Sequence, residues 1–142
     1  MTIYIEFLLH HWALFSLLIV VVVSILIFEL YALRLNPRKV TPEALVQFMN
    51  SDQGVVLDVR ASNAFKSGHI IHSVHIPADE LEKSSQLKSY KKKSLVIVHE
   101  DEPRALRAAN QLNRLGFANV KVLGGGIRSW KEADLPLETD KK

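Results

Sequence analysis

The sequence predicts an α/β fold with a mostly parallel sheet flanked by helices, preceded by one N-terminal transmembrane helix. An uninterrupted apolar run lies near the start of the chain, at residues 12–28. Downstream, short apolar runs alternate with amphipathic stretches, the pattern of a parallel sheet covered on both faces. The length of 142 residues allows one such domain plus an appendage.

The apolar run has the length of a membrane span. Within Trp12–Phe28 the polar side chains are Ser16 and Ser24, and none is charged. About twenty residues of helix rise roughly 30 Å, the thickness of the bilayer hydrocarbon. A buried core helix would carry a polar stripe, and a cleaved signal peptide would begin with basic residues. We therefore expect residues 12–33 to cross the lipid bilayer, after a short extracytoplasmic N-terminus of residues 1–11.

Basic residues follow the span but do not precede it. Arg34, Arg38 and Lys39 lie in a basic linker, residues 34–39, whereas residues 1–11 contain no Lys or Arg. The positive-inside rule then predicts a single-pass protein with its N-terminus outside and the rest in the cytoplasm, at a membrane that we expect to be the bacterial inner membrane. The net charge of +3 is too small to indicate a nucleic-acid partner.

The domain is expected over residues 40–137, followed by a polar tail, residues 138–142. Thr41 is a natural N-cap and Pro42 suits a first helical turn, which together predict a helix. Apolar runs predict four strands, at residues 54–60, 74–76, 95–98 and 119–123. A helix opened by Pro103 separates the last two strands and ends before Gly116, and a final short helix follows the glycines 124–126.

Several motifs follow one another in the domain. They are Asp58-Val59-Arg60, Phe65, Gly68-His69-Ile70 and Ile76-Pro77, then Arg104, Leu115-Gly116-Phe117, and Gly124-Gly125-Gly126-Ile127 with Trp130. In this order and spacing the domain resembles the rhodanese (thiosulfate sulfurtransferase) family. The resemblance implies the rhodanese fold and, in catalytic members, sulfur transfer from an anionic donor. One local departure is His72-Ser73, where relatives usually place Gly-Ala.

The resemblance also identifies the loop that carries the family's chemistry. In catalytic relatives a Cys follows the third strand, and the loop that it opens stabilises a thiolate and a persulfide with backbone N–H groups. The matching position is His99, which makes the equivalent loop His99-Glu100-Asp101-Glu102-Pro103-Arg104. Arg104 matches the residue that helps to hold the donor. The loop has the sulfurtransferase length, whereas phosphatases of this fold have one residue more.

Two features oppose sulfur transfer. The chain contains no cysteine, and imidazole cannot store a sulfane sulfur as a thiolate does. In addition, Glu100, Asp101 and Glu102 lie where the anionic donor would approach, and a like-charge contact at ~4 Å costs roughly 1 kcal/mol in water. We therefore expect no catalytic residue, no cofactor and an inactive homologue that binds another protein at the membrane.

Two alternatives remain open. A partner could bring the reactive thiol, which would make the domain a component of a sulfur relay. A metal-responsive domain could instead use His99, although we expect no metal site overall. In an extended chain His69 and His75 would stand roughly 20 Å apart and could not chelate together.

The remaining residues of the family motifs are expected to be structural. Asp58 and Arg60 should tie strand ends together, Gly68 and Gly125 should allow turns, and Trp130 should belong to the core.

Overall fold

The computed structural model describes residues 1–52 and 54–140, apart from the side chains of Arg34 and Leu35. The chain divides into two compact units, Met1–Leu35 and Asn36–Lys142. The side chain of Arg34, one of the cations behind the predicted orientation, lies outside the described residues. So do Lys141 and Lys142 of the expected tail.

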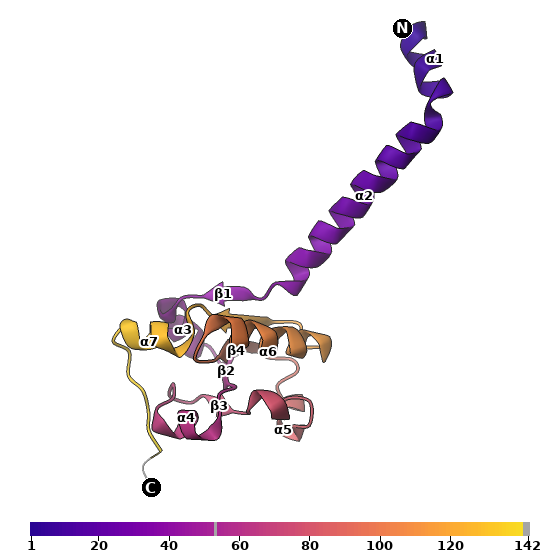
Figure 1. Ribbon diagram of the computed structural model, residues 1–142. Helices are drawn as coiled ribbons and strands as arrows, with labels where there is room; N and C mark the ends of the chain where they lie inside the picture. Colours follow the sequence, from indigo (N-terminus) through magenta and orange to yellow (C-terminus); the bar gives the residue numbers. More distant parts are fainter. Residues whose placement is uncertain (53, 141–142) are drawn as a thin grey trace. The chain divides into compact units, whose positions relative to one another are not determined.

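The first unit consists of two helices, α1 (Thr2–His10) and α2 (Trp12–Leu35), which Figure 1 draws in indigo and purple. Within α2, residues Trp12–Leu33 are long and apolar enough to cross a membrane. Ser16 and Ser24 each donate a hydrogen bond to a carbonyl of their own helix, three or four residues back. Both hydroxyls therefore have a hydrogen-bond partner within the helix itself.

The second unit is built on a five-stranded sheet of order β1-β5-β4-β2-β3. Its strands are β1 (Arg38–Val40), β2 (Gly54–Asp58), β3 (Val74–His75), β4 (Ser94–Val98) and β5 (Val120–Leu123). All four pairings are parallel, as the sequence predicts. All strands therefore begin on one side of the sheet and end on the opposite side. We call the side where the strands begin the amino edge and the side where they end the carboxyl edge.

The strand β1 is the one strand that the sequence does not predict among those of the described residues. Two of its three residues are charged, and its pairing depends on β5, where Arg38 faces Lys121 and Val40 faces Leu123 in register. Residues 34–39, expected as a basic linker, thus divide between the end of α2 and the start of β1. A short edge strand of this kind is specified by its distant partner more than by its own residues.

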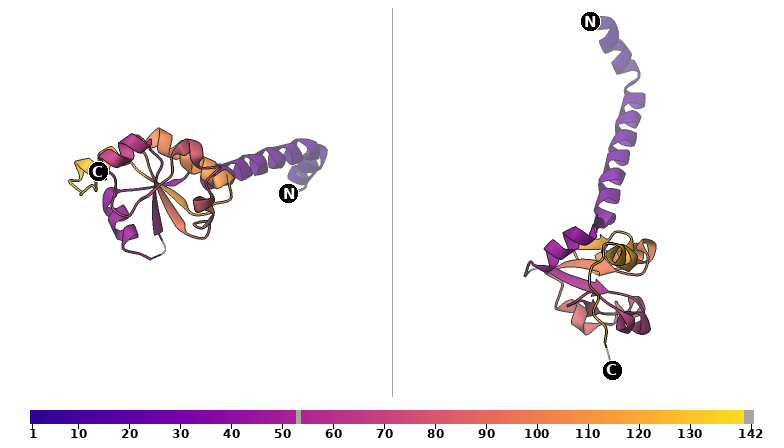
Figure 2. Two further views of the ribbon diagram at one scale, coloured as in Figure 1. Left: turned by 90° about the horizontal axis from the view of Figure 1, so that it is seen from below. Right: turned by 90° about the vertical axis from the view of Figure 1, so that its left-hand side faces the viewer.

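Helices cover both faces of the sheet (Figures 1 and 2). On one face the core includes residues of α5 (Ser85–Lys88) and α6 (Glu102–Arg114); on the other it includes residues of α3 (Pro42–Met49) and α7 (Gly126–Glu132). The short helix α4 (Ser62–Ser67) joins β2 to β3, and a 3-10 turn at Ala78–Glu80 follows β3. The short helices α1, α4 and α5 are, like β1, not predicted from the sequence. Thr41 caps α3 as predicted, accepting the N–H of Ala44 at 3.2 Å.

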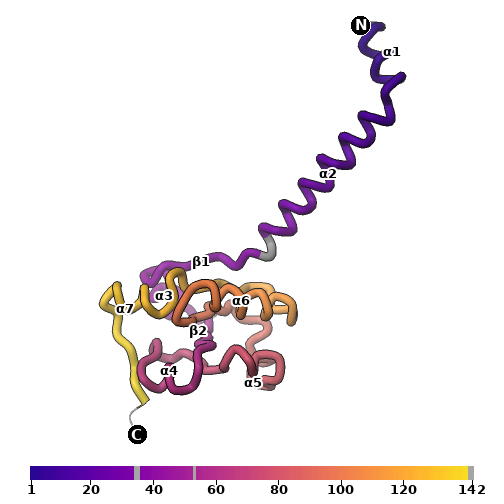
Figure 3. The backbone as a smooth tube through the Cα atoms, viewed as in Figure 1, coloured from indigo at the N-terminus to yellow at the C-terminus, as the bar shows by residue number. Residues whose placement is uncertain are grey.

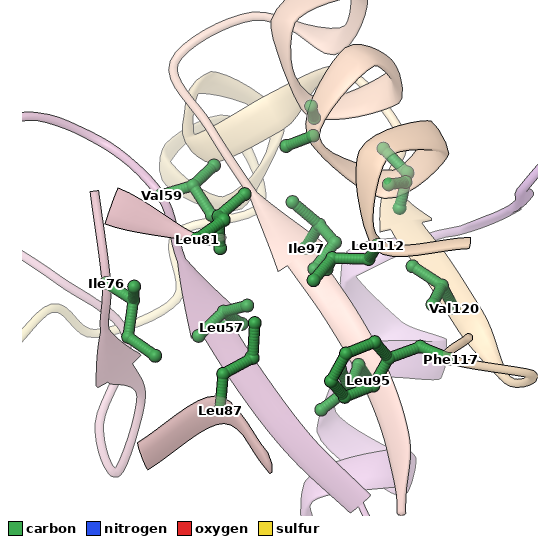
Figure 4. Packing of buried hydrophobic residues seen from close by; sticks show 14 residues of the cluster. Leu57, Val59, Ile76, Leu81, Leu87, Leu95, Ile97, Leu112, Phe117 and Val120 are labelled. Carbon is green, nitrogen blue, oxygen red and sulfur yellow. The ribbon is translucent and has the colours of Figure 1, made fainter. Parts of the chain in front are cut away.

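The central strand β4 shows why the sheet needs two covered faces. Leu95 and Ile97 belong to the cluster that also holds Leu112 of α6, and Figure 4 shows these side chains converging. Val96 and Val98 alternate with them and belong to the cluster on the opposite face. All four β4 side chains are fully buried, which explains the continuous apolar run in the sequence.

The chain beyond α7 returns to the domain and passes beside α4 (Figure 3). His69 and Glu138 form an isolated antiparallel bridge, in which each N–H donates to the carbonyl of the other at 2.8 and 2.7 Å. The indole N–H of Trp130 donates to the carbonyl of Pro136 at 3.0 Å. Asp140 also donates its N–H to the carbonyl of Lys66 at 3.3 Å, so the contacts with the domain extend into the tail expected at residues 138–142.

Candidate functional site

The loop that follows β4 lies at the carboxyl edge of the sheet. Val98 ends β4 in register with Asp58, which ends β2, so His99 emerges beside the end of the neighbouring strand. Asp101 is the N-cap of α6, which begins at Glu102. The loop is therefore a short strand-to-helix connection, in which polar side chains meet the N-terminus of a helix.

The loop supplies acceptors for its own backbone donors. The Nδ1 atom of His99 accepts the N–H of Glu100 at 2.8 Å. An oxygen of Asp101 accepts the N–H of Arg104 at 3.0 Å, the hydrogen bond of an N-cap. The N-terminus of α6, where a helix attracts anions, thus already holds a carboxylate of the chain itself. The sequence predicts Asp101 only as a repelling charge, so this capping role is an addition from the structure, although Asp two residues before Pro is a recognisable helix start.

Glu102 joins the loop to two distant segments. Its Oε2 atom accepts the N–H of Gly125 at 3.1 Å, and its Oε1 atom pairs with the ammonium of Lys39 in β1. The hydrogen bond from Lys39 is the main cause that lowers the pKa of the Glu102 carboxyl, followed by the bond from Gly125. Lys39 was expected as a linker residue, and nothing in the local sequence signals that it reaches this loop.

Charge in the loop is therefore more balanced than the sequence suggests. Asp101 lies 3.4 Å from the guanidinium Nε of Arg104, and Glu102 is paired with Lys39. Glu100 is exposed, as are Pro103 and most of the Arg104 side chain. The surface that the loop offers to solvent consists mainly of these three residues.

The triple glycine packs against the loop. A Cβ atom on Gly126 would lie 2.5 Å from the carbonyl oxygen of His99 and 2.6 Å from that of Glu100, and its φ is +66°. The next residue, Ile127, donates its N–H to the His99 carbonyl at 2.8 Å. Gly126 is needed because backbone approaches backbone here. The sequence predicts a tight turn at residues 124–126 but not its contact with the loop.

Burial lowers the pKa of His99 from 6.5. The charge of Arg104 lowers this pKa further, whereas the charges of Asp101 and, to a smaller extent, Glu100 raise it. The geometry agrees with a neutral ring, because Nδ1 must be unprotonated to accept the N–H of Glu100. The other ring nitrogen then carries the proton. A neutral imidazole in this position can exchange hydrogen bonds with a bound group, but it offers no thiolate.

Asp58 and Arg60 form a buried ion pair next to the loop. The guanidinium donates from Nε to Oδ1 at 3.0 Å and from Nη2 to Oδ2 at 2.8 Å, a parallel pair of hydrogen bonds, and Oδ1 of Asp58 also accepts the backbone N–H of Arg60. Arg60 donates further to the carbonyl of Gly68 at 2.7 Å. The pair thus fastens the end of β2 to the turn at residue 68, and no bond of the guanidinium in the described residues reaches the loop.

His69 and His75 lie much closer together than they would in an extended chain. The rings of His69 and His75 both stack on Phe65, with centroid distances of 3.9 and 4.4 Å. The estimate of roughly 20 Å between them is wrong because the chain turns at Ile71 and His72 rather than running straight. Trp130 is buried in the core.

Metal ligands do not gather in the described part of the chain. Across residues 1–52 and 54–140, no group of three or more His, Asp or Glu side chains is placed to hold a metal ion. His69 and His75 instead bond backbone carbonyls, those of Phe65 and Arg60, at 2.9 Å each.

Comparison with known proteins yields consistent matches. The profile of the rhodanese-like domain matches residues 41–133. The chain is 28% identical over 121 residues to the uncharacterized protein YibN of Escherichia coli strain K12, covering 84% of this chain and 85% of YibN. It is 26% identical over 102 residues to the thiosulfate sulfurtransferase GlpE of Pseudomonas putida, covering 72% and 91%. A rhodanese-related protein of Thermoplasma volcanium matches with a TM-score of 0.62 at 28% identity, over 71% of this chain and 97% of that one.

Proposed function

Because the chain belongs to the rhodanese-like domain family, we propose that it is a membrane-tethered member that has lost sulfur transfer and acts by binding another protein. The family includes sulfurtransferases, whose chemistry requires a thiolate. This chain contains no cysteine, and His99 stands where the resemblance places the nucleophile. Neither the loop nor any other segment can therefore carry a persulfide.

The observation that supports the proposal most is that carboxylates of the loop already accept the backbone N–H groups that an anion would use. Asp101 occupies the N-terminus of α6, and Glu102 occupies the N–H of Gly125. An incoming anion would have to displace Asp101 from the helix and separate it from Arg104. Such a loop is better suited to presenting a fixed surface than to capturing an anionic sulfur donor.

The tether follows from the apolar helix. We propose that residues 12–33 cross the bilayer, with residues 1–11 outside, residues 34–39 as the linker, and the domain of residues 40–137 and its tail in the cytoplasm. Arg38 and Lys39 on the domain side support this orientation, as does the absence of Lys and Arg from residues 1–11. Confinement to a bacterial inner membrane would raise the effective concentration of the domain near membrane partners.

The contact with the partner is proposed at the exposed part of the loop. Glu100 and Pro103 are exposed, and 61% of the Arg104 side chain is accessible. Their backbone is held by the hydrogen bonds of His99 and Asp101, so a partner would meet a preformed surface.

A second candidate is a sulfur relay in which the partner supplies the thiol and this domain positions it. The similarity to the sulfurtransferase GlpE favours this candidate. It differs from the first in its readout, because persulfide would pass between two partner proteins faster when the domain is present.

Site-specific photocrosslinking of the full-length chain in its native membrane tests the proposal. A photoreactive residue at Glu100 or Pro103 should capture the same protein, whereas one at Lys131, exposed on α7, should not. Equal capture from all three positions would contradict the assignment of the contact.

Enzymatic assays complete the test. The purified chain should form no thiocyanate from thiosulfate and cyanide above a protein-free control. Turnover that scales with protein concentration and survives repurification would overturn the proposal.

A further inference from the structure

Basic residues from separate segments of the domain gather at the amino edge of the sheet. Lys88 ends α5, Lys91, Lys92 and Lys93 precede β4, and Arg114 ends α6. Figures 1 and 3 show the α5–β4 connection and the C-terminal end of α6 on the same side of the domain. We call these five residues the basic edge.

Contacts confirm that these segments meet. A Cβ atom on Gly116, just beyond α6, would lie 3.3 Å from Cε and 3.5 Å from Nζ of Lys91. Lys88 and Lys91 border a groove whose apolar lining includes Leu115, an exposed side chain. The basic edge thus combines ammonium groups with accessible apolar surface, the composition of surfaces that lie at a membrane interface.

In the described residues no cation of the basic edge forms an ion pair with a carboxylate, and the contact made by Lys93 is with the ring of Tyr90, whose centroid lies 5.9 Å from Nζ. Among residues 1–52 and 54–140, the Lys and Arg side chains in ion pairs with carboxylates are Lys39, Arg60, Arg104 and Arg128, none of which belongs to the basic edge. The nearby acids are Asp52, before β2, and Glu82, on the groove, which accepts a hydrogen bond from Gln111. The basic edge therefore keeps a net positive charge.

The chain that leaves the apolar helix enters the domain at this same edge. β1 begins at Arg38, three residues after α2 ends, and it runs parallel to the other strands. So short a connection keeps headgroups at a high effective concentration around the start of β1. Lys and Arg side chains near an anionic leaflet are attracted to it over about one Debye length, roughly 8 Å at physiological salt.

We propose that the basic edge docks the domain onto anionic lipid headgroups. This inference rests on the membrane tether of the proposed function. Docking through the amino edge leaves the loop at His99, at the opposite edge of the sheet, free to meet a cytoplasmic partner. The surface that binds lipid and the surface that binds protein would then be the two ends of the same parallel strands.

Single cysteines make the proposal testable, because the native chain contains none. Ala118 at the amino edge and Ser62 at the carboxyl edge are both small, neutral and exposed. Full-length Ala118→Cys and Ser62→Cys would each carry a fluorophore and be inserted into bilayer nanodiscs containing headgroup-linked quencher. The discs would hold either phosphatidylcholine alone or phosphatidylcholine with one third phosphatidylglycerol.

We expect phosphatidylglycerol to increase quenching at residue 118 at least about threefold, and to leave residue 62 unchanged. Added salt at about 0.5 M should reverse the increase. Lys92→Glu with Lys93→Glu should abolish it, whereas Lys66→Glu with Lys131→Glu, which changes the net charge equally, should not.

Equal quenching at the two positions in both lipids, or loss of the effect in both charge variants, would overturn docking through this edge. Failure of the full-length chain to enter the discs at all, or to resist extraction by alkaline carbonate, would instead overturn the tether. An acidic protein as the true occupant would leave the label at residue 118 insensitive to phosphatidylglycerol, which also refutes the proposal.

Discussion

At the carboxyl edge of the sheet, cations are matched with carboxylates of the same chain: Lys39 with Glu102, Arg104 with Asp101, and Arg60 with the buried Asp58. At the amino edge, none of the ion pairs among the described residues includes Lys88, Lys91, Lys92, Lys93 or Arg114. The two ends of the same strands thus use charge differently. Pairing at one end holds backbone segments in place, whereas unpaired cations at the other remain available for an external anion.

The difference has an energetic reason. Asp58 and Arg60 are almost inaccessible, and a charge in such a place is tolerable only with its partner present. The lysines of the basic edge are exposed and hydrated, so leaving them unpaired costs little stability. Substitutions of the buried pair at the carboxyl edge should therefore act on folding, and those of the exposed lysines at the amino edge on binding.

The largest expected effect is on the buried pair. Asp58→Ala leaves the Arg60 guanidinium buried with one remaining bond, to the carbonyl of Gly68. We expect the free energy of unfolding of residues 36–142 to fall by about 3–5 kcal/mol in urea titrations. Lys92→Ala at the amino edge should change it by less than about 0.5 kcal/mol. Similar losses in the two variants would remove the contrast between the edges.

A second prediction concerns the balance of charge around His99. His99→Cys alone should give little thiosulfate turnover, because the neighbouring carboxylates repel the donor and disfavour the thiolate. Adding Glu100→Gln, Asp101→Asn and Glu102→Gln keeps the side-chain shapes and removes the charges. We expect at least ~10-fold faster turnover, which corresponds to about 1.4 kcal/mol in the barrier.

Equal rates in these two folded variants would show that the loop carboxylates have no electrostatic effect on donor approach. The ion pairs of Asp101 and Glu102 would then neutralise the loop, and its selection against anions would have to be steric. Thermal unfolding of each variant is the control that separates lost repulsion from lost structure.

The sequence predicts the strands of this sheet far better than the contacts of its loop. The continuous apolar run that contains Val96 and Val98 predicts a buried strand, because a strand covered on both faces has apolar side chains at successive positions. The role of Glu102 depends on Lys39 and Gly125, which lie far away in the chain, so no local pattern can reveal it. The stacking of His75 on Phe65 is equally invisible in the sequence, because it depends on the turn of the chain at Ile71 and His72.

A smaller effect should follow from the helix cap. Asp101→Ala removes the acceptor for the N–H of Arg104 and should lower the free energy of unfolding by about 1 kcal/mol. Asp101→Asn keeps an acceptor of the same shape and should cost only a few tenths of that value. If the two variants prove equally unstable, the charge of Asp101 matters more than its hydrogen bond.

The smallest effect should appear in the dependence of stability on pH. Burial lowers the pKa of His99 in the folded state from 6.5, so the unfolded chain takes up this proton first as the pH falls. The stabilisation is complete above about pH 6.5 and declines as the pH drops toward the folded pKa. His99→Asn keeps an acceptor for the N–H of Glu100 but cannot titrate, so urea titrations should show a flatter profile between pH 7.5 and 5.5. The wild-type loss over this range, relative to the variant, should stay below about 1 kcal/mol, because His99 is only half-buried.

Measuring above pH 5 excludes Glu102, whose lowered pKa affects stability only when the pH falls below about 4.5. Lys92→Ala at the amino edge should leave the wild-type slope intact, since it does not change the surroundings of His99. A wild-type domain that gains stability on acidification, relative to His99→Asn, would mean that Asp101 and Glu100 outweigh burial, and that the loop holds its imidazole as a cation.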